Sequence, residues 1–242
     1  MTTATAAREA EVRDLLTLTT TTWIDGDTVV PGIPGVWSPT GGGVELKAAP
    51  DDGLTIAGEP VTGPVVITPD VSGLYFGRVR VQLVIRDGLP AIRTWDPDAP
   101  TLLAFKGIDS YDHDAAWIRP AVFRPFGETR PETVPTADGR ERDLILVGEV
   151  VVDLPGGSHT LAVTEAPGGG LSAQFGDLTN GEETYRFRTL PLPAPGPNGT
   201  LEADFNQAHL PPCALTDHFL CFFPPPGNHL DVKVTAGEKR LA

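Results

Sequence analysis

The chain is poor in basic residues, methionine and cysteine, and the shortage of positive charge limits its partners. Its 242 residues hold 18 Lys+Arg against 32 Asp+Glu, which gives a formal net charge of −14, and they include 1 Met and 2 Cys. Nucleic acids and anionic membranes both attract proteins through a surplus of lysine and arginine. We therefore expect neither nucleic acid nor membrane among the partners.

Long apolar stretches are also absent. No run approaches the ~20 apolar residues that a membrane-spanning helix needs. The first residues, "MTTATAAREAEVRDLL", do not show the basic and then apolar order of a secretory signal. We expect a cytoplasmic location, which favours thiols over a disulfide. A disulfide between Cys213 and Cys221, across seven intervening residues, stays open as the alternative.

Signatures of common cofactor and catalytic sites are missing as well. The glycine-rich stretches do not match the phosphate-binding pattern G-x-x-x-x-G-K-[ST], and no G-x-S-x-G elbow occurs. These absences argue against nucleotide binding and against an ordinary α/β-hydrolase. We predict no cofactor.

What the chain does have is regular punctuation by glycine and proline, 27 and 25 residues respectively, between short apolar runs. The clearest run, "GRVRVQLVIRDG", alternates apolar and polar residues as a half-buried strand does and ends on the turn pair Asp87-Gly88. Roughly ten such segments predict an all-β, mainly antiparallel sandwich or barrel. One short helix is expected near the N-terminus, over residues 5–16, and an irregular connection over residues 97–143.

The length suits one β-rich domain covering residues 1–242. A boundary near residues 69–77 would divide it into a small N-terminal β subdomain, about residues 20–70, packed on a main domain of residues 71–242. The smaller part is poor in large apolar residues, so we expect that it does not fold alone.

The segment Asp204–Leu230 concentrates both cysteines and three of the five histidines. Cys213, His218 and Cys221 follow the spacing C-x4-H-x2-C, which is not a recognised zinc pattern. We predict no metal and keep these three as candidate ligands. Cys213 could instead be a nucleophile served by His209 or His218 and by Asp204. The proline content favours a third interpretation, a clasp over one end of a β domain with buried thiols.

Three functions remain open. The first is a small-molecule-binding pocket protein, because closed sheets leave a mouth that aromatic walls and a few polar groups can line. Its candidate ligand-binding residues are Arg93, Trp95, Trp117, Thr179, Tyr185 and Asn206. The second is a cofactor-independent hydrolase or isomerase that uses Asp204, His209 or Cys213. The third is a structural or protein-interaction domain, and the oligomeric state stays open.

Five motifs that follow one another along the chain indicate a family. They are "RDGLPAIRTWD", "GDLTNGEETY", "ADFNQAHLPPC", "CFFPPPGNHL" and "VTAGEK". Together they resemble the bacterial and archaeal domain-of-unknown-function family DUF1684, over about Trp23 to Lys239. The resemblance implies no activity, ligand or cofactor. The chain departs from the family at Gln207 and His209, where arginine and tyrosine are usual, and at "RFRTLPL", which replaces a glycine-rich turn and its arginine.

Overall fold

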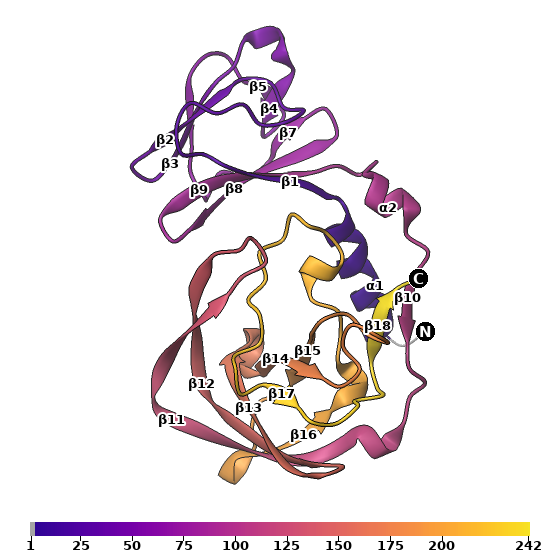
Figure 1. Ribbon diagram of the computed structural model, residues 1–242. Helices are drawn as coiled ribbons and strands as arrows, with labels where there is room; N and C mark the ends of the chain where they lie inside the picture. Colours follow the sequence, from indigo (N-terminus) through magenta and orange to yellow (C-terminus); the bar gives the residue numbers. More distant parts are fainter. Residues whose placement is uncertain (1–2) are drawn as a thin grey trace. The chain divides into compact units, whose positions relative to one another are not determined.

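The computed structural model describes residues 3–242, which form two compact units that divide at Ala104 and Phe105 (Figure 1). Nearly all strands in both units pair antiparallel, and a helix lies at the N-terminus. The prediction of an all-β, mainly antiparallel fold with a short N-terminal helix is therefore confirmed. No helix in the described residues has the length and apolar character needed to cross a membrane.

The first unit contains a six-stranded sheet in the order β1-β9-β8-β7-β4-β5 and a three-stranded sheet in the order β2-β3-β6. Its elements are α1 (Thr3–Leu16), β1 (Leu18–Trp23), β2 (Val36–Thr40), β3 (Gly43–Lys47), η1 (Pro50–Asp52), β4 (Leu54–Ile56), β5 (Glu59–Pro60), β6 (Val65–Ile67), β7 (Leu74–Phe76), β8 (Val79–Arg86), β9 (Leu89–Trp95) and α2 (Pro100–Ala104). Fully buried Trp37 and Leu46 pack with Leu83 and Ile92 in one apolar core that both sheets share.

The second unit is built on a curved sheet in the order β15-β14-β13-β12-β11-β16, with β17 added parallel to β14, and it has a separate pair, β10-β18. Its elements are β10 (Ile108–Ser110), η2 (Ala115–Trp117), β11 (Ile118–Pro135), β12 (Glu141–Leu154), β13 (Gly157–Glu165), η3 (Pro167–Gly169), β14 (Leu171–Asp177), β15 (Arg188–Leu192), η4 (Pro197–Gly199), β16 (Thr200–Asp204), η5 (Phe205–Gln207), η6 (Pro212–Ala214), β17 (His229–Leu230) and β18 (Glu238–Leu241).

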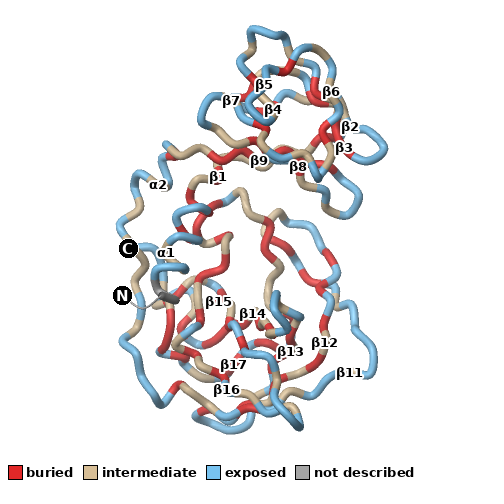
Figure 2. Tube along the Cα trace, turned by 180° about the vertical axis from the view of Figure 1, so that it is seen from behind, coloured by how far each residue is buried: buried red, intermediate tan, exposed pale blue. Residues whose placement is uncertain are grey.

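Buried and more exposed side chains alternate along β12. Every second residue of β12 from Arg142 to Leu154 is buried, as expected for a strand with one face on a core. The buried positions can be followed along β12, β13 and β14 in Figure 2. The pair Asp87-Gly88 joins β8 to β9, and both residues have positive φ (53° and 76°) as a tight hairpin turn requires.

Strand β11 corrects the expectation of an irregular connection over residues 97–143. It pairs with β12 along Ala121–Pro125 and again along Arg130–Pro135, with an irregularity between the two stretches. On its other side β16 covers only Ile118–Val122. Beyond Val122 the strand therefore has one side without a paired strand, where proline, which lacks an N–H, is tolerated.

Asn228 closes a gap between two strands of the second unit. β13 and β14 pair at Thr164 and Glu165 only, and then separate. Where they separate, the fully buried Asn228 amide accepts from Ala162 N at 2.8 Å and donates to the carbonyls of Ala162 and Gln174, each at 2.8 Å. The Asn228 side chain thus supplies the hydrogen bonds that these partly buried backbone groups would otherwise form with a neighbouring strand.

Residues 69–77, where the sequence suggests a boundary, include β7, which pairs with both β4 and β8 of one sheet. The contact-based division falls instead between Ala104 and Phe105. Whether either unit folds alone stays a prediction.

We expect Asn228→Ala to lower the free energy of unfolding by about 2–4 kcal/mol, because three buried backbone groups lose their partner. Urea denaturation, followed by amide exchange of β13 and β14, measures the loss. The neighbouring exposed residue His229 provides the control, since His229→Ala should change stability by less than about 0.5 kcal/mol. Equal losses in the two variants would contradict the role given to Asn228.

Candidate functional site

The loop between β14 and β15 is folded around the carboxylate of Asp177. Asp177 Oδ1 accepts from the backbone N of Thr179 at 2.7 Å and from its hydroxyl at 2.6 Å. Asn180 Oδ1 accepts from Asp177 N at 2.6 Å, and the hydroxyls of Thr179 and Thr184 lie 2.8 Å apart. Aspartate, threonine and asparagine commonly close turns by such side-chain bonds. The loop is therefore fixed from within.

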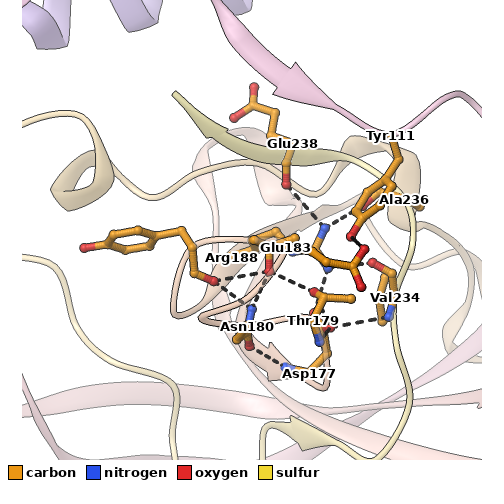
Figure 3. A network of polar contacts seen from close by, with 11 residues as sticks. Tyr111, Asp177, Thr179, Asn180, Glu183, Arg188, Val234, Ala236 and Glu238 are labelled. Atoms are coloured by element: carbon orange, nitrogen blue, oxygen red, sulfur yellow. Dashed lines mark hydrogen bonds and ion pairs between the residues drawn. The ribbon is translucent and has the colours of Figure 1, made fainter. Parts of the chain in front are cut away.

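Arg188 at the start of β15 carries the positive charge that balances Asp177. Both side chains are fully buried, and Arg188 Nη2 lies 2.7 Å from Asp177 Oδ2. The guanidinium also donates to the carbonyl oxygens of Val234 at 2.8 Å and Ala236 at 2.5 Å, with a longer contact to that of Glu238 at 3.3 Å (Figure 3). One arginine thus ties the loop to the C-terminal segment.

The C-terminal segment that Arg188 contacts has little regular structure. Only His229–Leu230 pairs as a strand, and the residues that follow run without a ladder until β18. Their carbonyl oxygens need other donors, because buried backbone acceptors are rarely left unpaired. The Arg188 guanidinium supplies them.

A second polar group lies at the outer side of the same loop. Tyr111 OH donates to Glu183 Oε2 at 2.9 Å, and Lys233 Nζ lies 3.1 Å from Glu183 Oε1 (Figure 3). Lys239 Nζ sits 5.1 Å from the centre of the Tyr111 ring. Burial, together with the bond to the Glu183 carboxylate, raises the pKa of Tyr111 to about 12. Both oxygens of Glu183 are thus already engaged.

The residues at the tip of this loop line a surface hollow of about 530 Å³. Its lining residues are Gly181, Glu182, Glu183, Thr184, Tyr185, Arg186 and Arg240. The exposed Arg186 guanidinium lies 4.3 Å from the ring centre of Phe223 and 5.4 Å from that of Tyr185. Among the described residues it forms no ion pair with a carboxylate, whereas Arg240 lies 3.7 Å from Asp109.

The two thiols lie beside Tyr185. Cys213 and Cys221 are 7% and 8% exposed and are not joined in a disulfide. The backbone N of Cys213 donates to Cys221 Sγ at 3.2 Å, and Tyr185 OH donates to the Cys213 carbonyl oxygen at 3.1 Å. Phe187 packs against both cysteines. Both thiols therefore lie at the base of the loop that lines the hollow.

Hydrogen bonding favours the thiolate form of Cys213. The Cys221 thiol hydrogen-bonds its side chain and, with Tyr185 and Arg186, lowers the pKa of Cys213 to about 7, although burial acts in the opposite direction. Burial raises the pKa of Tyr185 to about 12, and a negative charge on Cys213 acts in the same direction. Near neutral pH the Tyr185 hydroxyl is therefore a proton donor beside a thiol that ionises.

A short hairpin holds the segment that carries Cys221. Ala137 N donates to Cys221 O at 2.9 Å, and Thr136 forms a bridge with Phe222. The hairpin is closed by Arg142, whose guanidinium contacts both carboxylate oxygens of Asp138, at 2.8 and 3.0 Å. The Arg142 bond, helped by one from the Thr136 hydroxyl, holds the pKa of Asp138 well below its usual range.

The other residues singled out from sequence lie in several places. Arg93 and Trp95 belong to β9 of the first unit, where Arg80 stacks on the Trp95 ring at 4.6 Å. In the second unit Trp117 is buried and packs edge-on against Phe205, with ring centres 6.0 Å apart. Thr179 is fully buried inside the loop. Of the six candidate ligand residues, Tyr185 is the one that lines the hollow.

Asp204 and Asn206 form a local turn. Asp204 ends β16, and its Oδ1 accepts from the backbone N of Asn206 at 3.0 Å and from its side-chain Nδ2 at 2.8 Å. Asn206 Oδ1 also accepts from Asp114 N at 3.0 Å, which attaches the η2 region. Asp204 is thus the last residue of β16, whereas Asn206 lies in η5.

The candidate base and metal ligands lie along the segment that follows. The Nδ1 atom of His209 is 3.2 Å from Gln207 O, and His218 N donates to the hydroxyl of Thr216 at 3.2 Å. Within residues 3–242 no group of three or more His, Cys, Asp and Glu side chains is placed to hold a metal ion. The catalytic roles considered for Asp204, His209 and Cys213 stay predictions.

Arg186, Arg188 and Arg240 were not among the residues predicted from sequence. β15 begins at Arg188, which is buried, whereas Arg186 precedes the strand and is exposed. The motif "GDLTNGEETY" and the departure from the family's glycine-rich turn are the sequence signals that mark this place.

The second unit is thus a curved antiparallel sheet whose polar loop is fixed by a buried ion pair. A model for a family described as a protein of unknown function (DUF1684) matches residues 103–239, more than half of the chain. The chain belongs to this family. The matched residues cover nearly the whole second unit, and the motif at Arg86–Asp96 lies outside them.

The solution NMR structure of an uncharacterized protein from Haloarcula marismortui is similar to this chain. The two are 29% identical, with a TM-score of 0.48, and the similarity covers 60% of this chain and 82% of that one. No curated protein matches the sequence.

We expect Arg188→Met to lower the free energy of unfolding by about 3–5 kcal/mol, because it leaves the buried Asp177 carboxylate without its cation. Combining it with Asp177→Asn should cost less than the sum of the two single losses. Amide exchange of β14 and β15 in urea measures these values for the second unit. Arg124→Met, at an exposed position of β11, is the matched control and should have little effect. Additive losses would refute the pairing.

We expect Asp138→Asn to destabilise the protein by about 1–3 kcal/mol at neutral pH, because Arg142 then lacks its anion. The folded-state pKa of Asp138 is depressed, so its contribution is present above the unfolded value of about 3.9 and is lost as the pH falls further. The melting temperatures of variant and wild type should therefore converge as the solution is acidified. Glu141→Gln, at the exposed neighbouring position, serves as the control. A constant difference at all pH values would contradict this account.

Proposed function

We propose that this chain binds a small molecule carrying a carboxylate or phosphate group in the hollow formed by Gly181–Arg186 and Arg240. Arg186 is the observation that carries the proposal. Its guanidinium is exposed, rests on aromatic rings and has no carboxylate partner among the described residues. A guanidinium held in this way is ready to take an anionic group.

The chemistry of arginine supports an anion of this type. The planar guanidinium presents paired N–H donors that match carboxylate and phosphate oxygens, and it is more weakly hydrated than an ammonium. Stacking over the rings of Phe223 and Tyr185 limits its rotation, which reduces the entropy lost on binding. Arg240, which already has Asp109 nearby, provides a second positive charge at the edge.

The rest of the hollow suits a small organic ligand. Its volume of about 530 Å³ lies within the ~300–1,000 Å³ typical of small-molecule sites. The Tyr185 ring adds an apolar wall, so a ligand that joins an anionic group to a ring or chain should bind better than the bare anion. Of the two acids that line the hollow, Glu183 is already engaged by Tyr111 and Lys233, so a cationic ligand would be served by Glu182 alone.

Titration of the ¹⁵N-labelled protein with phenyl phosphate and with inorganic phosphate tests the proposal. We expect shifts confined to Gly181–Arg186 and Arg240, and tighter binding of phenyl phosphate because its ring can contact Tyr185. Arg186→Ala should weaken phenyl phosphate binding about tenfold, the value of one charge-assisted contact.

Arg124→Ala is the matched control, since it removes an exposed arginine of the same unit away from the hollow. It should leave the affinity nearly unchanged. Equal losses in the two variants, or shifts spread over all arginines, would mean general attraction of anions to the surface and would refute the site.

A further inference from the structure

The fold holds the two cysteines of this chain in contact. Cys213 N donates to Cys221 Sγ at 3.2 Å, and the Cys221 thiol hydrogen-bonds the Cys213 side chain. A disulfide requires side chains that approach this closely, with Cα atoms within about 7 Å. Both residues are buried, with 7% and 8% of their surface exposed, so the oxidant must be as small as hydrogen peroxide.

Different contacts hold the two cysteines in place. Cys213 lies in η6, directly after Pro211 and Pro212, and its carbonyl oxygen accepts from Tyr185 OH. Cys221 is held from the other side by Ala137 N and by the bridge between Thr136 and Phe222. The contact between Cys213 and the Cys221 sulfur is therefore a property of the folded chain and should be lost on unfolding.

The surroundings distinguish the two sulfurs chemically. Tyr185 OH lies 3.9 Å from Cys213 Sγ, and the Arg186 guanidinium adds a positive charge near it. These groups and the Cys221 thiol stabilise a negative charge on Cys213, and its pKa falls to about 7. Since the thiolate is the nucleophilic form, Cys213 is the sulfur that reacts first.

We propose that Cys213 and Cys221 form a redox-active pair, in which hydrogen peroxide oxidises Cys213 and Cys221 then closes a disulfide. The stacking of Arg186 and the hydroxyl of Tyr185 would assist the first step. The inference does not depend on ligand binding in the hollow, because it concerns only the protein and the oxidant.

Both steps are balanced. In the first, the Cys213 thiolate attacks one peroxide oxygen, an S–O bond forms, the O–O bond breaks, and the departing hydroxide takes a proton to become water. In the second, the Cys221 sulfur attacks Cys213 Sγ, an S–S bond forms, and the sulfenic oxygen leaves as a second water with the Cys221 proton. The two thiols together lose two electrons, and the peroxide gains them.

Oxidation of the native protein, compared with oxidation in urea, provides the test. The reduced protein is treated with hydrogen peroxide, alkylated with N-ethylmaleimide, and measured as an intact mass. We expect the native protein to lose two hydrogen atoms and take up no maleimide. Disulfide formation should be at least about tenfold faster in the native protein than in the urea-unfolded one, because only the fold lowers the thiol pKa and joins the sulfurs.

Two variants then assign the roles. Cys221→Ser should stop at a sulfenic acid on Cys213, which dimedone traps, whereas Cys213→Ser should leave Cys221 largely unoxidised over the same period. Arg186→Ala should slow oxidation several-fold and Arg124→Ala should not, because only Arg186 lies near Cys213.

The comparison of native and urea-unfolded wild-type protein does not depend on whether any variant folds. Oxidation that is no faster in the native protein, or that ends in sulfinic acid without a disulfide, would overturn the proposal. Dimedone labelling of Cys221 ahead of Cys213 would also overturn it.

Discussion

The buried ion pair between Arg188 and Asp177 is the constraint on which the second unit depends. Two charges removed from water are stable only if most of their remaining hydrogen-bonding groups find partners. Here the second carboxylate oxygen accepts from Thr179, and the terminal nitrogens of the guanidinium donate to Asp177 and to the carbonyl oxygens of Val234 and Ala236, whereas the buried Nε atom has no partner among the described residues. The pair can form only when β14, β15 and the C-terminal segment are all in place. It therefore links residues far apart in the chain into one arrangement.

The surface features follow from that buried arrangement. Thr184, Phe187 and Arg188 are buried, whereas at the tip of the loop Arg186 is exposed and Tyr185 is half-buried with its hydroxyl on the Cys213 carbonyl. There they contact the hollow on one side and the Cys213 thiol on the other. The buried network fixes the backbone that carries Tyr185 and Arg186. Side chains that are already held in place lose little conformational entropy on binding a ligand, which favours binding.

The sequence was informative where local rules decide the structure. The β8–β9 hairpin follows from strict alternation and from Asp87-Gly88, which tolerate positive φ. Strand β11 was missed because it contains several prolines, and proline is disfavoured in a strand that is paired on both sides. Its prolines are tolerated because β16 pairs only with Ile118–Val122, which the sequence does not reveal. The role of Arg188 was hidden for a similar reason. Its acceptors lie 46 to 50 residues further along the chain, and no local pattern identifies them.

The groups that contact Cys213 favour a negative charge there, although the chain as a whole is acidic. A formal net charge of −14 should disfavour both a thiolate and an anionic ligand. Salt screens exposed charges beyond about 8 Å at physiological ionic strength, so distant carboxylates contribute little at this loop. The groups in contact are the Arg186 guanidinium, the Tyr185 hydroxyl and the Cys221 thiol, all of which favour a negative charge. Two acids line the hollow: Glu183 is balanced by Lys233 and Tyr111, and the exposed Glu182 also acts on the charge of Lys233. An acidic protein can therefore present one site that favours anions, because its sign is set by neighbours within a few ångströms and not by the overall charge.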